Sequence, residues 1–168
     1  MREVRVMRAI KLLQGLAPDQ RFDMLAWGQG DLNETLAELT EDDLRNGCGT
    51  AACALGWIAS TEAARAEGLR LVIPKYGDSY LVEYRQFRTK EPLTGIDAAW
   101  RYFGFEFEVT AQYLFLPTKY GLKISRITPA MVANRMQIIL DIGEAAFLAD
   151  KDVSGCRDVL AVPQPVSA

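Results

Sequence analysis

The sequence predicts a helix-dominated α+β fold, in which one globular domain over residues 1–149 carries one antiparallel β-hairpin at about 69–84. Three observations lead to this prediction. The 168 residues are 49% hydrophobic, which suits a single core. Apolar residues recur at helical spacing along most of the chain, and only two adjacent segments are typical of strands. No repeated βαβ order predicts a parallel sheet, and residues 150–168 are expected to form a loosely held C-terminal tail.

The first third of the chain is expected to be helical. A helix over residues 3–16 is predicted from apolar residues three or four positions apart: Val6, Ala9, Ile10, Leu13 and Leu16. A connection over 17–30 leads to an acidic stretch, where Leu32, Leu36 and Leu39 have the spacing of a short helix within 31–43. The next helix is predicted over 51–66, with Thr50 as its N-cap and Gly68 beyond its end.

Two strands and three further helices follow. The segments "LRLVI" (69–73) and "SYLVEY" (79–84) are rich in β-branched and aromatic residues, and the turn "PKYGD" joins them into a hairpin. Thr94 is expected to begin a helix containing "IDAAWRYFGF", and Thr110 to cap a short helix that ends near Pro117. Thr128 followed by Pro129 predicts the start of a helix reaching about residue 148.

Composition excludes several classes of function. The sequence has no histidine, which removes the commonest general base and the commonest metal ligand, so no cofactor or metal is expected. A net charge of −3 and a pI near 5.1 disfavour a nucleic-acid partner. No long apolar run indicates a membrane span or a signal peptide, so we expect a cytoplasmic protein without a membrane partner. Three cysteines are too few for a disulfide scaffold.

One face of the first predicted helix is basic. Four cations follow one another at every third position and form a candidate partner surface: Arg2, Arg5, Arg8 and Lys11. Such a stripe is most often a solvated face, and the alternative is a docking surface for an acidic partner. The acidic cluster "TEDD" at 40–43 lacks the alternating ligands and the glycine of a calcium loop, so a solvated turn is expected there.

The segment "GCGTAACALGW" (47–57) is the one motif that could carry chemistry. Its candidate ligand or thiol site consists of Cys48, Gly49, Thr50, Cys53 and Trp57. The commonest role for such cysteines is structural, as small apolar side chains beside a close helix contact. Three alternatives remain open: a thiolate activated by a helix N-terminus, an anion site made by backbone amides, and a metal site. Each lacks a partner that the chemistry needs, such as a histidine base, a phosphate-loop lysine or a second cysteine pair.

The motif also carries a resemblance. Positions Cys48, Gly49, Thr50, Cys53, Gly56 and Trp57, with the later "YLFLP", resemble a set of small bacterial and phage-encoded proteins that share a C-G-T/S-x-x-C-x-x-G-W/H segment. The resemblance spans roughly residues 20–140. These proteins are uncharacterised, so the resemblance implies a bacterial or phage origin but no activity, cofactor or residue roles.

Sequence alone therefore does not assign a function. The expectation is a non-enzymatic intracellular accessory protein that binds a macromolecular partner, either another protein or a second copy of itself. The alternative is a small-ligand or anion-binding protein, or a thiol-dependent enzyme, working at Cys48 and Cys53.

Overall fold

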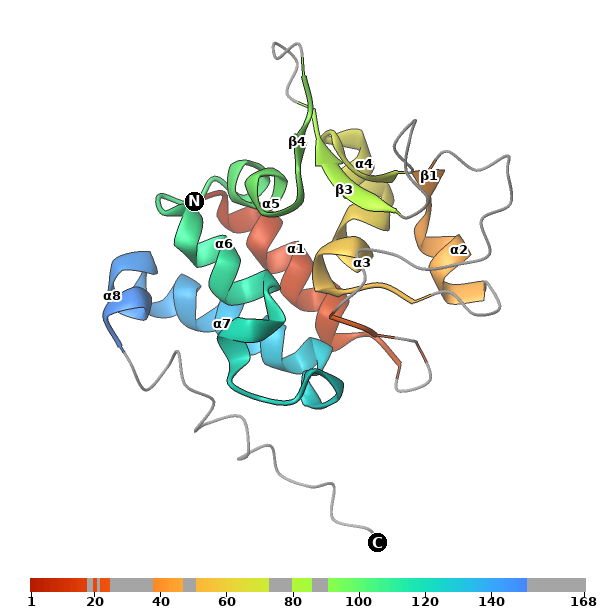
Figure 1. The fold of residues 1–168 in the computed structure, drawn as a ribbon. Coiled ribbons are helices and arrows are strands. Elements are labelled where there is room, and N and C mark those ends of the chain that lie inside the picture. The colour runs from red at the N-terminus through yellow and green to blue at the C-terminus, as the bar shows by residue number, and fades with distance from the viewer. Residues whose placement is uncertain are drawn as a thin grey trace, which may run out of the picture.

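A computed structural model describes residues 1–17, 20, 22–24, 38–46, 51–72, 80–85 and 91–150 (Figure 1). The described residues form eight α-helices, two short 3-10 helices and one four-stranded sheet, which confirms the helix-dominated α+β class. The helices are α1 (Glu3–Gln14), α2 (Glu41–Asn46), α3 (Ala54–Ser60), α4 (Glu62–Ala66), α5 (Gly95–Phe103), α6 (Glu108–Phe115), α7 (Pro129–Ile142) and α8 (Glu144–Ala149). The 3-10 helices are η1 (Pro117–Tyr120) and η2 (Ile124–Arg126).

The sheet is antiparallel throughout, with strand order β1–β2–β3–β4. Its centre is the predicted hairpin, β2 (Leu69–Val72) and β3 (Leu81–Tyr84), while the turn over 73–79 lies outside the described residues. The two-residue strands β1 (Glu38–Leu39) and β4 (Leu93–Thr94) widen it on either side. Buried and more exposed residues alternate along β2 and β3, so one face of the sheet packs on the helices.

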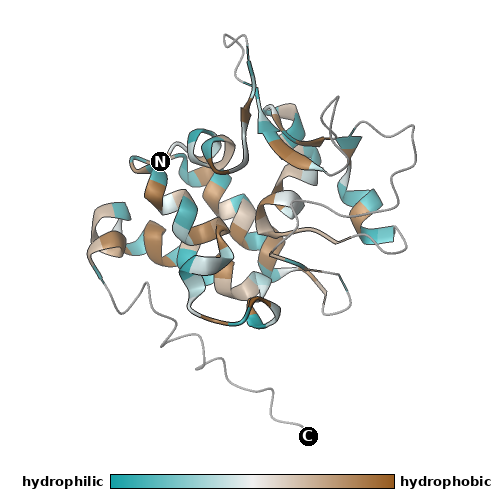
Figure 2. Cartoon of the chain, viewed as in Figure 1, coloured by the Kyte–Doolittle hydropathy of each residue, from teal (hydrophilic) through white to brown (hydrophobic). Residues whose placement is uncertain are grey.

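Helix α1 crosses the middle of the molecule, as the red ribbon of Figure 1 shows. Its buried residues are Val6, Ala9, Ile10 and Leu13, as the spacing predicts. This face packs mainly against α7 and also contacts α3 and α5. In Figure 2 hydrophobic and hydrophilic residues alternate along the helices, as expected for helices with one buried face. One continuous core therefore joins the helices to the inner face of the sheet.

The predicted helix over 51–66 is two helices, and it begins three residues later than expected. Ala52 is extended and forms an isolated parallel bridge with Phe22, so α3 starts only at Ala54. Thr61 interrupts the helix because its backbone is extended (ψ 145°). Its hydroxyl accepts a hydrogen bond from the Ala64 backbone N–H, which caps α4. The sequence pattern missed this break because alanines on both sides favour a helix.

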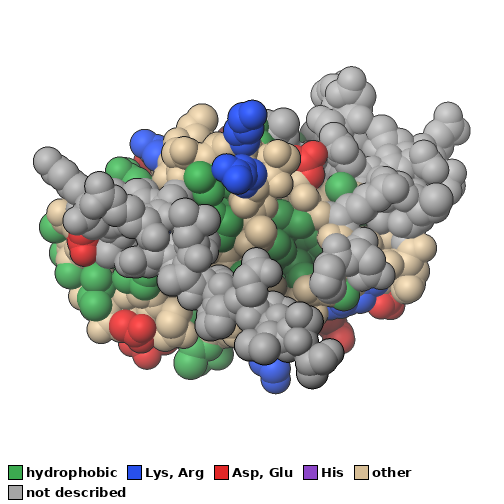
Figure 3. All heavy atoms as spheres, turned by 90° about the horizontal axis from the view of Figure 1, so that it is seen from below, with side chains coloured by type: hydrophobic (Ala, Val, Ile, Leu, Met, Phe, Trp, Pro, Cys, Tyr) green, Lys and Arg blue, Asp and Glu red, His purple; other side chains and the backbone are tan. Residues whose placement is uncertain are grey.

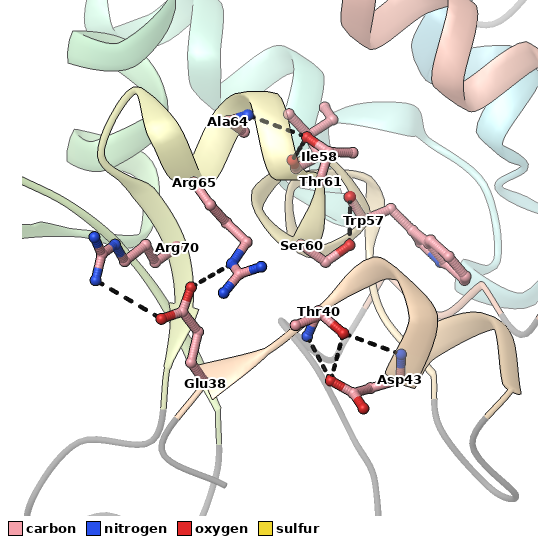
Figure 4. A network of polar contacts seen from close by, with 10 residues as sticks. All are labelled: Glu38, Thr40, Asp43, Trp57, Ile58, Ser60, Thr61, Ala64, Arg65 and Arg70. Atoms are coloured by element: carbon pink, nitrogen blue, oxygen red, sulfur yellow. Dashed lines mark hydrogen bonds and ion pairs between the residues drawn. The ribbon is translucent and has the colours of Figure 1, made fainter.

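The acidic stretch folds differently from the prediction. Leu39 lies in strand β1 instead of a helix, and residues 31–37 are outside the described ranges. The cluster at 40–43 starts α2: Asp43 Oδ2 accepts hydrogen bonds from the backbone N–H and the hydroxyl of Thr40, at 2.8 and 2.6 Å (Figure 4). The backbone N–H of Asp43 donates to the Thr40 hydroxyl in return. The acidic residues thus serve a helix N-terminus, where negative charge is favoured.

Strand β1 is held by a second polar contact, drawn in Figure 4. Glu38 pairs with Arg65 of α4 at 2.5 Å and lies 3.7 Å from Arg70 of β2. One carboxylate thereby links a helix to two neighbouring strands. A strand of two residues makes few ladder hydrogen bonds, so this charge contact helps to fix its position.

In the second half of the chain two predicted starts are confirmed and two details are wrong. Thr94 is the N-cap of α5, and Thr128 with Pro129 begins α7. Thr110 is not a cap, because α6 already begins at Glu108. The long last helix is broken at Gly143, whose positive φ of 84° ends α7 and separates it from α8.

The carboxylate of Glu144 provides the cap that Thr110 does not. It is 8% exposed and accepts hydrogen bonds from the backbone N–H groups of Glu106 (3.0 and 3.1 Å) and Phe107 (3.3 Å). The Thr110 hydroxyl donates a further bond of 3.0 Å. A side chain from the first residue of α8 thus satisfies the N-terminus of α6, more than thirty residues away in sequence.

We predict that Glu144→Ala lowers the free energy of unfolding by about 2–3 kcal/mol, because it leaves part-buried donors without an acceptor. Urea unfolding followed by circular dichroism measures this change. Glu106→Ala is the control: it removes an exposed carboxylate beside the same donors and is expected to cost less than about 0.5 kcal/mol. Equal losses for the two variants would contradict the capping role.

Candidate functional site

Cys53, the second cysteine of the motif, is buried and structural. It is the N-cap of α3, and its sulfur accepts a hydrogen bond from the Gly56 backbone N–H at 3.5 Å. The residue is only 2% exposed. Burial raises the pKa of the thiol to about 11, in spite of the backbone N–H groups that lower it. At neutral pH Cys53 is therefore a protonated thiol and a poor nucleophile.

Most of the rest of the predicted thiol or ligand site lies where the structure is not described. Cys48, Gly49 and Thr50 lie outside the described residues. Trp57 is fully buried in α3, with the guanidinium of Arg45 5.8 Å from its ring centre. Within the described ranges, no three acidic or cysteine side chains cluster closely enough to hold a metal ion.

The basic stripe divides into two halves with different roles. Arg2 and Arg5 tie α1 to the rest of the fold. Arg2 donates to the Tyr84 hydroxyl of β3 at 3.2 Å, and Arg5 donates to the Tyr102 carbonyl of α5 at 2.5 Å. The guanidinium of Arg5 also lies over the Tyr102 ring, 4.4 Å from its centre. These two arginines fix where the N-terminal helix sits.

The outer half of the stripe consists of Arg8 and Lys11, which are exposed. Arg8 donates to Oε1 of Glu67, and Arg5 pairs with Oε2 of the same carboxylate at 2.5 Å. Burial tends to raise the pKa of Glu67, but the hydrogen bond from Arg8 and the charges of Arg5 and Arg8 outweigh it and leave the pKa below its usual value. One carboxylate thus serves two guanidinium groups, while Lys11 forms no ion pair within the described part of the chain.

Exposed apolar side chains accompany these cations on α1. Val4 is 63% and Met7 51% exposed, among only five large hydrophobic side chains exposed in the described residues. Val4, Met7, Arg8 and Lys11 have the spacing i, i+3, i+4, i+7 of a single helix face. We call these four residues the α1 stripe. Met and Arg are enriched at protein interfaces, so this face is a candidate surface for binding another protein.

A hollow of about 160 Å³ borders the α1 stripe. It lies where α1 meets α3, α4 and α5. Its floor is formed by apolar side chains of three helices: Ala9, Leu12, Ile58 and Ala64. Arg5 and Arg8 line it as well. The hollow therefore combines an apolar floor with cationic groups.

A second hollow, of about 280 Å³, is lined mainly by charged side chains beside β1. Its charges are already paired, because Glu38 contacts both Arg65 and Arg70 (Figure 4). It offers neither an apolar floor nor an uncompensated charge, so it is the weaker candidate for binding.

Sequence reasoning missed Glu67 and the hollow. Glu67 follows α4 as its C-cap residue and reads as an ordinary polar helix end. Its role depends on α1 and α4 lying side by side, and no local spacing predicts that contact. The partly exposed Leu12 and the largely buried Ile58 likewise look like ordinary core positions until the helices are placed.

The wider surface and the comparisons with known proteins add few constraints. On the face seen from below, charged side chains of both signs are scattered among hydrophobic ones (Figure 3). No helix of the described residues has the length and apolar character needed to cross a membrane.

No protein-family profile, curated protein or solved structure was found to match the sequence.

We predict that Cys53 resists alkylation in the folded protein. With a pKa of about 11, only about one thiol in a thousand is ionised at pH 8. A Cys48→Ser/Cys156→Ser variant isolates this thiol, and labelling with iodoacetamide at pH 8 measures its reactivity by mass spectrometry. Labelling should become fast only in denaturant. A rate in the native state close to that of a free cysteine peptide would show that the site opens to solvent.

Proposed function

We propose that the protein is a non-enzymatic, intracellular accessory protein that binds an acidic segment of a protein partner through the α1 stripe. The observation that carries this proposal is the exposed pairing of Val4 and Met7 with Arg8 and Lys11 on one helix face. Apolar contacts supply affinity, and the two cations select a partner of opposite charge. The adjoining hollow extends this surface toward α4.

The division of the basic residues supports the same proposal. Arg2 and Arg5 contact Tyr84 and Tyr102, so they hold the helix in place and present its outer face. Arg8 and Lys11 project from that face and are the groups that a partner can reach. Direct binding is thus assigned to the outer half of the predicted stripe.

The alternative of a thiol-dependent enzyme receives less support. Cys53 is buried and its pKa is raised, whereas a nucleophilic cysteine is accessible and has a lowered pKa. The chain also has no histidine to act as a base. All seven residues of α3 are buried, while Cys48, Gly49 and Thr50 of the predicted anion site lie outside the described part of the chain.

The proposal predicts that Val4→Glu/Lys11→Glu abolishes partner binding without unfolding the protein. Both side chains are exposed, and neither makes a polar contact among the described residues that folding would need. The variant and the wild type, each tagged, are expressed in cells that naturally produce the chain. Partners are then cross-linked with a photoreactive reagent that does not require lysine, because the variant removes the one lysine of α1, and are identified by mass spectrometry. The expected result is a partner cross-linked near α1 in the wild type and lost in the variant.

The control variant is Lys123→Glu/Ala130→Glu, which has the same net charge and changes exposed positions near the start of α7. It is expected to keep the partner. If both variants keep the same partners, or if all cross-links of the wild type map away from α1, the proposed binding surface is wrong.

A further inference from the structure

We infer that the partner inserts one aliphatic side chain into the hollow and places a neighbouring carboxylate on Arg8, in competition with Glu67. The inference rests on the proposed function and specifies the chemistry of the segment that binds. It follows from the volume and lining of the hollow, from the shared carboxylate, and from the position of Arg8 between the hollow and the α1 stripe.

The volume of the hollow suits one side chain. Its free space is about 160 Å³, and an apolar protein cavity of about 150 Å³ is large enough to hold benzene. Apart from the two arginines, Thr61 and Tyr102, its lining is aliphatic and comes from Ala9, Leu12, Ile58, Ala63 and Ala64. A polar anchor would lose its hydrogen bonds to water on this floor, so a leucine, isoleucine or methionine side chain fits best.

The charge of the site selects the residue beside that anchor. Arg5 and Arg8 share the single carboxylate of Glu67, so this cluster carries an excess of positive charge. An incoming aspartate or glutamate would supply the missing negative charge. Its carboxylate would accept a hydrogen bond from the guanidinium of Arg8, as the carboxylate of Glu67 does in this structure.

The two arginines differ in how freely they can change partner. The side chain of Arg5 is 15% exposed and is also held by the carbonyl and ring of Tyr102. The side chain of Arg8 is 41% exposed, and Glu67 is its only hydrogen-bond or ion-pair partner among the described residues. Arg8 can therefore turn toward a ligand while Arg5 keeps Glu67 in place. Glu67 acts as an internal competitor that sets the affinity of the site.

The hollow and the α1 stripe are adjacent and share Arg8. Arg8 belongs to both, since it lines the hollow and lies between Met7 and Lys11 in the helix face defined above. A bound segment whose aliphatic residue enters the hollow therefore places its neighbours over the exposed apolar residues of α1. The acidic residue next to the anchor meets Arg8 at the border.

A random peptide display library tests the inference directly, because it samples every short sequence that could occupy the hollow. Peptides are selected on the full-length protein, and the affinity of the enriched peptides is measured by fluorescence anisotropy. Selected sequences are expected to carry Leu, Ile or Met within a few positions of Asp or Glu. Replacing that aliphatic residue by Ser, or the acidic residue by Lys, should weaken binding at least about tenfold.

Two matched variants on α4 locate the binding site. Ala63 is exposed and lines the hollow, so Ala63→Leu fills it from the rim and should weaken binding at least about tenfold. Ala66→Leu makes the same change on the same helix but outside this hollow, and it should leave the affinity unchanged. Equal binding by both variants would overturn the inference.

Glu67→Gln tests the competition. Removing the internal carboxylate should raise the affinity for the selected peptides about two- to fivefold, the effect expected for a partly exposed ion pair. An unchanged or lower affinity in a folded variant would overturn the competitor role. If the library enriches no acidic aliphatic motif while Val4→Glu/Lys11→Glu still loses the natural partner, this inference fails and the proposed function stands. If that double variant keeps the partner, the proposed function fails.

Discussion

The fold depends on a helix that has no exposed residue. Every residue of α3, from Ala54 to Ser60, is buried, and the helix contacts α1, α2, α4 and both central strands. A helix enclosed on all sides needs small side chains where neighbours approach, and its polar ends must be satisfied internally. Cys53 and the Thr61 hydroxyl meet this requirement at the two ends, where they bond the Gly56 N–H and the Ile58 carbonyl. Enclosure therefore explains the place of Cys53 at the start of this helix.

The same enclosure determines what the N-terminal helix can present to solvent. Because α1 must cover α3 and α7 with its apolar face, its orientation is fixed, and arginines at its edge reach α5 and β3. Arg5 is held by contacts within the fold, and the regular spacing of basic residues in the sequence does not predict those contacts. The exposed face of α1 lies next to these arginines and carries Val4, Met7, Arg8 and Lys11. The proposed binding residue Arg8 thus lies beside the structural residue Arg5, and both pair with the carboxylate of Glu67.

The sequence could predict those features that depend on neighbours along the chain. Helix α1, the β2–β3 hairpin and the Thr128–Pro129 start follow from periodicity and capping, and the structure agrees. One error occurs where a distant residue replaces a local signal. Glu144 caps α6 from the far side of α7, so Thr110 is free to lie inside the helix. The candidate hollow is of the same kind, because its walls come from residues about fifty positions apart in sequence.

Net charge is a poor guide to this surface. The chain carries −3 overall, which disfavours a nucleic-acid partner that is recognised by a broad field. Charge–charge interactions in water are screened beyond about 10 Å, so a partner segment responds to the groups within that distance. Near the hollow these groups include Arg5, Arg8 and the competing carboxylate of Glu67. A protein that is acidic as a whole can therefore select an acidic segment, provided that an apolar anchor brings the carboxylate within reach of Arg8. The apolar contact and the charge contact depend on each other, which is why the hollow and the α1 stripe are best understood as one surface.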